Sequence, residues 1–335
     1  MGAVPFLRPG WIRAWSRAFG RGRLEPVVQH RDNQLVGIVP LQIQRGVYSS
    51  PTNWHSPEFG PVTADGADSE LVERVLDAGH RGRRVSLAFL GEAEDRLAAW
   101  RELAEGKGWR VLTRVIAQPA AIDLHDAADW EGYAASRSRN LRSDLRRCSR
   151  RLAESGSVSF FMYQNPGELL PELLEEGFRI EGLAWKAQRG TAIQSSPATE
   201  RFYREVAGWA AGRGILRLAF LHCAGRAVAF EFAIEEGGVY WALKGGHDPT
   251  FNPCGPGKLL LRDTIKYAID EGVRRFEMGP VEDYKRRWAN SSRDLHLFQA
   301  FPPSPQGFAE WSAFRYGRPA AKAGVSRLRM FHGTS

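Results

Sequence analysis

A short loop rich in glycine and proline carries the clearest signal for binding an anion. The segment Cys254-Gly255-Pro256-Gly257-Lys258 joins a predicted strand to a predicted helix. Glycines let an anion approach the backbone, and the N–H groups and dipole of a helix N-terminus favour a phosphate. The glycine-rich lysine motif of Walker loops is absent, so this shorter loop suits a pyrophosphate. The alternative is an ordinary helix start, in which proline is favoured, followed by a solvated basic face.

A carboxylate on a predicted central strand is a candidate general base. In the strand Val228–Ile234, Glu231 lies between Ala229 and Ala233 on one face, and larger apolar side chains occupy the other face. Removing water from such a carboxylate raises its pKa, which suits a group that accepts a proton from an amine. A glutamate at a sheet edge, or one paired with arginine, is the alternative.

Two further segments combine aromatic and charged side chains. The loop that begins at Glu181 contains Trp185 and Lys186, and functional residues occur often on such loops. Tyr284 and Lys285 follow the end of a predicted strand, where open α/β sheets place ligands. Tyr284 is a candidate proton donor to a leaving thiolate, and Lys285 is a candidate partner for a phosphate or carboxylate. The alternatives are a packing tryptophan and a surface lysine.

The elements that must position these residues form a mixed α/β pattern. Strands are predicted over 216–222, 227–235 and 239–244, followed by a helix that opens near Gly257 and stops before Gly272. A strand over 275–278, a short helix near 282–289 and a strand over 295–301 complete this half. The first half repeats the order of elements, with weak residue-level identity. We therefore expect two α/β units.

An amphipathic helix over 138–154 is expected to join the two units. Leu141, Leu145, Cys148 and Leu152 form its apolar stripe, and arginines occupy another face. These patterns predict domains at residues 1–135 and 136–304, with a basic helical tail over 305–335. The arginine-rich face is a candidate binding surface for the phosphates of RNA or lipids, although such a face is more commonly just solvated.

Composition limits the class of protein. The 335 residues include 43% hydrophobic and 25% charged residues, which is ordinary for a globular chain. The formal charge of +8 gives a mild attraction for polyanions. The three cysteines form neither a disulfide framework nor a metal-ligand spacing, so we expect no metal and a reducing compartment. We expect a cytoplasmic protein, because the sequence contains no signal peptide and no transmembrane run.

Several motifs together resemble the CelD-like acetyltransferase family of the GNAT superfamily, which is related to the Fem-type aminoacyl transferases. The block from Glu181 through Trp185-Lys186 to Gly190-Thr191-Ala192 is similar to one family block. Lys244 with His247-Asp248 resembles a second block, with histidine in the place of tyrosine. Gly255-Pro256-Gly257 resembles the phosphate loop, with glycine in the place of serine, and Tyr284-Lys285-x-x-Trp288 resembles the ending. The resemblance covers roughly residues 3 to 302.

The resemblance implies tandem GNAT-like domains, of which the N-terminal one is non-catalytic. Acetyl-CoA or another acyl-CoA would bind the C-terminal domain through Lys244, Gly255, Pro256, Gly257 and Lys258. An acceptor amine would attack the thioester, Glu231 would take the proton, and Tyr284 would protonate the thiolate. The residues expected to bind the acceptor are Glu181, Trp185, Lys186, Asp248, Lys285 and Trp288.

Three functions remain open on the sequence. The first is an acyl-CoA-dependent N-acyltransferase acting on an amino sugar or another small amine, linked to polysaccharide or cell-envelope synthesis. The second is a Fem-like transferase that uses aminoacyl-tRNA. The third is a non-catalytic scaffold or regulator of exopolysaccharide synthesis. We expect no DNA partner, and a tRNA partner only if the second function is correct. Peripheral contact with a membrane is compatible with the sequence, which does not indicate the oligomeric state.

Overall fold

The computed structural model describes residues 4–64, 68–91, 94–183, 192–280 and 283–317. The chain divides into two compact units, and each unit combines two segments that are distant in sequence. Unit 1 consists of Met1–Phe19 and Gln118–Arg293, and unit 2 consists of Gly20–Ala117 and Asp294–Ser335. This division differs from the predicted limits of 1–135, 136–304 and 305–335.

The difference in limits arises because two strands pair outside the half of the sequence in which they were expected. Strand β9 (Pro119–Asp123) pairs antiparallel with β14 (Arg275–Pro280) in unit 1. Strand β16 (Leu295–Phe301) pairs with β7 (Arg84–Leu90) and β8 (Arg110–Ala117) in unit 2. Each strand completes a sheet built from the other end of the chain. Position along the sequence therefore did not indicate the hydrogen-bonding partner.

Unit 1 is built on one mixed sheet, whose described strands follow the order β10-β11-β12-β13-β14-β9-β15. Among the described strands of this sheet, β13 and β14 are the one pair that runs parallel. Strands β11 and β12 are buried along almost their whole length, because helices cover both faces of the sheet. The further strands are β10 (Val158–Tyr163), β11 (Leu216–Cys223), β12 (Arg226–Glu236), β13 (Val239–His247) and β15 (Ser291–Ser292).

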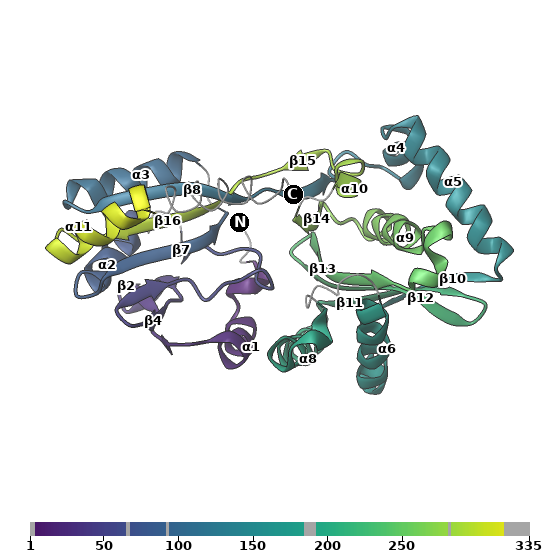
Figure 1. Cartoon of the computed structure of the whole chain (residues 1–335), viewed down its shortest axis with the longest axis horizontal. Coiled ribbons are helices and arrows are strands. Elements are labelled where there is room, and N and C mark those ends of the chain that lie inside the picture. The colour runs from purple at the N-terminus through teal and green to yellow at the C-terminus, as the bar shows by residue number, and fades with distance from the viewer. Residues whose placement is uncertain (1–3, 65–67, 92–93, 184–191, 281–282, 318–335) are drawn as a thin grey trace, which may run out of the picture. The chain divides into compact units, whose positions relative to one another are not determined.

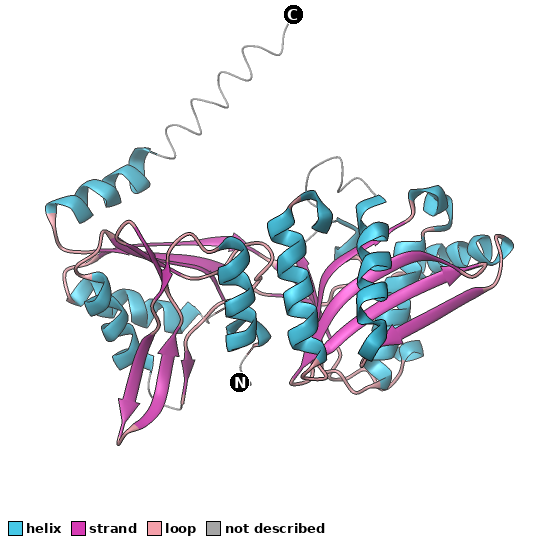
Figure 2. Ribbon diagram, turned by 90° about the horizontal axis from the view of Figure 1, so that it is seen from below, coloured by secondary structure: helices cyan, strands magenta, loops and turns pink. Residues whose placement is uncertain are grey.

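Helices pack on the two faces of this sheet and enclose two apolar clusters (Figure 1). One face carries α4 (Trp130–Ala135), α5 (Arg139–Glu154) and α9 (Pro256–Asp270). The other carries α1 (Pro9–Phe19), α6 (Leu170–Leu183) and α8 (Pro197–Ala211), and Figure 2 views the molecule from that side. The alternation along β12 therefore places Glu231 on the face shared with α5 and α9.

Local sequence explains where the two helices of the site begin. Ser138 caps α5, because its hydroxyl accepts a hydrogen bond of 3.2 Å from the Leu141 N–H. Gly255, in the left-handed conformation at φ 59°, precedes α9, and Pro256 occupies the first helical position. Helix α10 (Asp283–Arg286) is shorter than the helix predicted near 282–289.

Unit 2 contains the remaining sheets and helices. One sheet has the order β1-β4-β5-β7-β16-β8, and a second has the order β2-β3-β6. The further strands are β1 (Arg23–Leu24), β2 (Val27–Arg31), β3 (Gln34–Val39), β4 (Gln42–Gln44), β5 (Val47–Ser49) and β6 (Val62–Thr63), and the helices are α2 (Asp68–Gly79), α3 (Glu94–Gly106) and α11 (Pro305–Ser312). The predicted tail over 305–335 is described as far as residue 317, and the rest lies outside the described residues.

Across the described ranges, no helix combines the length and the apolar character needed to cross a bilayer.

Candidate active site

Two central strands of unit 1 separate at the site. Pairing between β13 and β14 joins Val239–Trp241 with Arg275–Glu277, and β13 then continues to His247. A register shift between Phe232 and Ala233 on β12 makes Leu243 an extra residue on β13. A bulge of this kind bends a strand and turns nearby side chains, which is common beside functional sites. Helix α9 begins shortly after β13, so the separating strands and the helix N-terminus belong to one region.

Glu231 lies on β12 in this region and forms a hydrogen-bonded pair with Tyr240. The Tyr240 hydroxyl donates to Glu231 Oε1 at 2.9 Å. Tyr240 is fully buried and stacks on Phe276, whereas Glu231 is only half-buried and keeps some access to solvent. Desolvation raises the pKa of Glu231 to about 7, although the Tyr240 hydrogen bond and the Lys285 charge both lower it. A carboxyl with this pKa exchanges protons readily near neutral pH.

One residue of the predicted Tyr284-Lys285 segment, Lys285, lies close enough to Glu231 for its charge to act on the carboxyl. Lys285 Nζ donates to the Met278 carbonyl of β14 at 2.7 Å, and it also lies 5.9 Å from the centre of the Tyr284 ring. Tyr284 is 45% exposed. The structure thus brings the predicted Lys285 near the predicted Glu231. Burial and the nearby Glu231 carboxyl keep the pKa of Tyr240 well above its ordinary value, so Tyr240 stays protonated.

The loop before α9 is held by its own polar contacts. Asp248 accepts hydrogen bonds from the Thr250 N–H at 2.9 Å and the Thr250 hydroxyl at 2.7 Å, and it forms an ion pair with Arg226. These contacts account for the buried Asp248 carboxylate, which was predicted to bind substrate. His247 Nε2 lies 2.7 Å from Asn252 Oδ1, and this contact orients the imidazole beside the loop.

The two glycines of the loop have tight surroundings. A Cβ atom at Gly255 would lie 2.8 Å from the Cys148 sulfur, and one at Gly257 would lie 3.1 Å from His247 Nδ1. The N–H groups of Lys258 and Leu259 both donate to the Gly255 carbonyl, at 3.0 and 3.3 Å. Gly255 therefore permits a close approach of the loop to α5, and Gly257 a close approach to the end of β13.

A polar pocket of about 480 Å³ adjoins the start of α9. Its lining residues come from α5, α9 and the segment after α10: Asn140, Ser143, Asp144, Arg147, Lys258 and Arg287. The side chain of Lys258 lines this pocket and remains partly exposed. Three of the lining side chains are cations and one is an anion, so the pocket carries a net positive charge.

Asp144 is the centre of the charges in this pocket. Its carboxylate contacts Lys258 Nζ at 2.8 Å, Arg147 at 2.5 Å and Arg287 at 3.5 Å. The hydrogen bond from Lys258, with the charges of the three cations, lowers the pKa of Asp144 below its ordinary value. Asp144 is therefore ionised at neutral pH and holds the three cations together. An incoming phosphate would compete with this carboxylate for the same donors.

The other predicted residues are more dispersed. Trp288 is buried in the cluster shared with α5 and α9, and Lys244 lies over the Tyr203 ring on the opposite face of the sheet. Glu181 is fully buried, and its Oε2 accepts from the Ile193 N–H at 2.8 Å. Trp185 and Lys186 lie outside the described residues.

Sequence reasoning missed Tyr240 and the α5 side of the pocket. The sequence did contain one signal for the pocket. Asp144 is an acidic residue next to the apolar stripe of a helix that is otherwise rich in arginine. Tyr240 gave no local signal, since it reaches Glu231 only through the pairing of β12 with β13.

Comparison with known proteins identifies the fold of this region. A profile of the family described as "Acetyltransferase (GNAT) domain" matches residues 139–286. No curated protein sequence matches the chain. Among solved structures, FemX is similar with a TM-score of 0.59 and 12% identity, over 88% of this chain and 92% of FemX.

Two further solved structures have the same arrangement. L-PGS from Bacillus licheniformis is similar with a TM-score of 0.57 and 14% identity, over 96% of both chains. A C-terminal domain assigned to a lysylphosphatidylglycerol synthetase of Agrobacterium fabrum gives a TM-score of 0.56 at 14% identity, over 90% of this chain and 91% of that domain. At this level of identity the likeness shows the fold alone. The predicted fold class, a mixed α/β fold of the GNAT type, is confirmed.

Proposed function

We propose that the protein transfers an acyl group from an acyl-CoA to an amine. The observation that carries this proposal is the positively charged pocket beside the start of α9, the helix that packs on the same face of the sheet as Glu231. A polyanionic carrier suits the three cations of the pocket, and a carboxyl with a pKa of about 7 suits removal of the proton that the attacking amine releases.

In the proposed reaction the donor phosphates bind the backbone at Gly257 and the Lys258 ammonium group. The amine nitrogen attacks the thioester carbonyl, forming the C–N bond, and its proton passes to Glu231 directly or through one water molecule. The C–S bond then breaks, and the thiolate takes a proton from Tyr284, whose half-exposed position supports this role. Tyr240 holds the Glu231 carboxyl through its 2.9 Å hydrogen bond.

The proposed acceptor is an amino sugar or another small amine used in polysaccharide or cell-envelope synthesis. This part of the proposal rests on the CelD-like pattern of motifs. The buried Glu181 and the segment after it, together with the half-exposed Tyr284 and Lys285, are the proposed acceptor-binding groups. Asp248 and Trp288 would support the site through the fold, because the Asp248 carboxylate and the Trp288 backbone carbonyl both accept hydrogen bonds from the protein itself.

Calorimetric titration with acetyl-CoA tests the donor. We expect Lys258→Ala to weaken acetyl-CoA binding about 10-fold, because a hydrogen bond to a charged group contributes about 1.5 kcal/mol or more. Lys266→Ala is the matched control, since Lys266 is exposed on the same helix. Equal affinities for the two variants would remove Lys258 from the donor site, and no heat with the wild-type protein would contradict the acyl-CoA donor.

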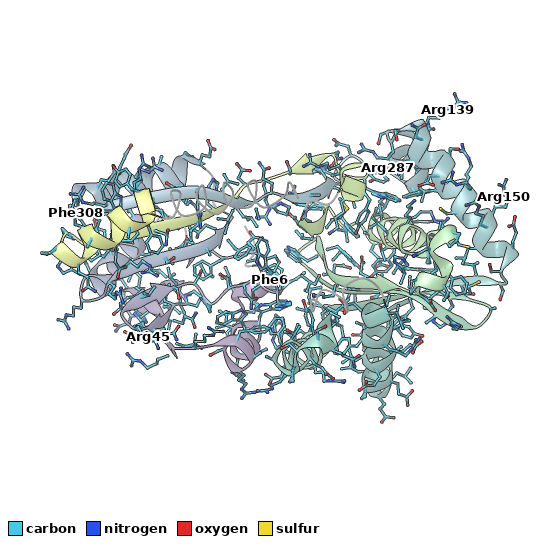
Figure 3. All side chains as sticks on the ribbon, viewed as in Figure 1. Phe6, Arg45, Arg139, Arg150, Arg287 and Phe308 are labelled. Carbon is cyan, nitrogen blue, oxygen red and sulfur yellow. The ribbon has the colours of Figure 1, made fainter. Side chains whose placement is uncertain are left out.

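An aminoacyl-tRNA donor is the second candidate, and one observation favours it. Arginines of α5 extend the positive charge of the pocket along an exposed helix face, where Figure 3 labels Arg139 and Arg150, with Arg287 nearby. A long row of cations suits a nucleic-acid backbone better than a single cofactor.

Filter binding with bulk tRNA tests the second candidate. If tRNA is the donor carrier, replacing Arg139, Arg146 and Arg150 together by glutamine should weaken binding. The slope of log affinity against log salt concentration should also fall by about one unit for each phosphate that these arginines neutralise in the wild-type protein.

A matched variant separates this effect from general charge. Arg13, Arg17 and Arg201 are exposed on α1 and α8 of the same unit, so their replacement by glutamine removes the same charge elsewhere. Equal decreases in affinity for the two triple variants would indicate nonspecific attraction and contradict a tRNA site on α5. Failure of both the acetyl-CoA and the tRNA experiments would leave the non-catalytic scaffold.

A further inference from the structure

Three side chains that carry potential metal-ligand atoms meet in unit 2, whereas the site of the proposed transferase belongs to unit 1. Glu94 begins α3, Asp294 precedes β16, and His296 lies on β16. One potential ligand atom of each residue lies within 4.8 Å of the others. Donor atoms around a tetrahedral Zn²⁺ with bonds of about 2.1 Å are about 3.4 Å apart. Small side-chain movements would therefore bring the three atoms to coordination distance.

His296 supplies a second observation that indicates a ligand. Its side chain is only 7% exposed, and its Nδ1 is buried with no hydrogen-bond partner among the described residues. An imidazole nitrogen that is removed from water without a partner is costly, and buried polar atoms in native proteins are almost always bonded. A metal ion is a natural partner for such an atom, because neutral imidazole is a common ligand.

The backbone around His296 is irregular on both sides. The pairing of β16 with β7 shifts register between His296 and Phe298, and the pairing with β8 shifts between Leu295 and His296. On β7, Phe89 has a φ of 58°, which is rare for a bulky residue. Bulges of this kind turn a side chain away from the direction of a regular strand, and they gather at functional sites.

We propose that Glu94, Asp294 and His296 bind a divalent transition-metal ion, Zn²⁺ or Mn²⁺. One imidazole and two carboxylates suit these ions, whereas Ca²⁺ and Mg²⁺ prefer oxygen ligands alone. Three protein ligands leave a coordination position for water or a further group. The ion would link the N-terminus of α3 to the start of β16. It would therefore stabilise the position of β16, a strand from the C-terminal part of the chain, in the sheet of unit 2.

The test uses the full chain, without a histidine tag and stripped of metal by a chelator. Calorimetric titration with Zn²⁺ and separately with Mn²⁺ should show one ion per chain for at least one of the two. Binding should also raise the Tm, because a ligand that binds only the folded state stabilises it. Glu94→Gln should weaken binding at least ~10-fold, since loss of even an outer-sphere partner costs that much.

Control variants separate this site from adventitious binding. Glu102→Gln removes an exposed carboxylate of the same helix α3 and should leave affinity and Tm shift unchanged. His296→Asn should abolish binding; should it fail to fold, Asp294→Asn replaces it in the comparison with Glu94→Gln. The proposal is overturned if the wild-type chain binds neither ion stoichiometrically, or if Glu94→Gln binds as tightly as Glu102→Gln. Acetyl-CoA binding plays no part in these outcomes, so they are independent of the proposed transferase function.

Discussion

Replacing Glu231 by glutamine is expected to lower kcat for acyl transfer by at least ~100-fold, the range for loss of a general base. The affinity for acetyl-CoA should stay unchanged, because the donor phosphates bind at the start of α9. The glutamine is nearly isosteric and can still accept the hydrogen bond from Tyr240, so the fold should persist. Turnover is measured by thiol release from acetyl-CoA with a panel of amino sugars and amino acids. Unchanged kcat would exclude Glu231 as the base.

The pH dependence of the reaction rate is a second test of Glu231 as the general base. A base acts in its ionised form, and kcat/KM reports the pKa of the free protein, so kcat/KM of the wild-type protein should rise with pH through about 7, the pKa of Glu231, and then level off. Tyr240→Phe removes a hydrogen bond that lowers this pKa, so the midpoint should move to higher pH. Glu235→Gln is the matched control, because Glu235 shares the strand and face but pairs with Arg217 at 3.0 Å. A midpoint that moves equally in both variants would contradict the assignment.

Local patterns predict the elements of the site well, because they depend on neighbours in sequence. Alternation along Val228–Ile234 places Glu231 apart from the larger apolar side chains, and the structure has the same arrangement. Proline and glycine at the start of α9 and the apolar stripe of α5 likewise act within a few residues. The pairing of β9 and β16 depends instead on strands from the other end of the chain, which no local pattern records.

The charges of the site were less predictable for the same reason. The sequence predicts a solvated or phosphate-binding role for Lys258. In the structure, its ammonium group donates a hydrogen bond to Asp144, which lies 114 residues earlier in the chain. The pKa of Glu231 was predictable in direction from burial. Its value near 7 depends also on Tyr240 and Lys285, which only the folded sheet brings close. The type of a residue thus indicates which chemistry its side chain can perform, and the fold determines which other side chains it interacts with.

Replacing Gly257 by tryptophan is expected to weaken acetyl-CoA binding by at least ~100-fold. Even a Cβ atom at this position would lie 3.1 Å from His247 Nδ1, so the indole must extend over the start of α9 where the phosphates are proposed to bind. Loss of two hydrogen bonds to a charged phosphate, at about 1.5 kcal/mol or more each, accounts for a factor of this size. Calorimetric titration measures the change in Kd.

The same substitution at Gly208 controls for the added aromatic surface. Gly208 is an exposed residue of α8, in the same unit, and a Cβ atom there meets no neighbour within 4 Å. Gly208→Trp should therefore bind acetyl-CoA like the wild-type protein. The Tm of both variants shows whether either has unfolded. If a folded Gly257→Trp variant binds acetyl-CoA normally, the phosphates do not rest on the N-terminus of α9. The pocket around Asp144 would then need a different anion, for which the row of arginines on α5 makes an RNA backbone the first to test.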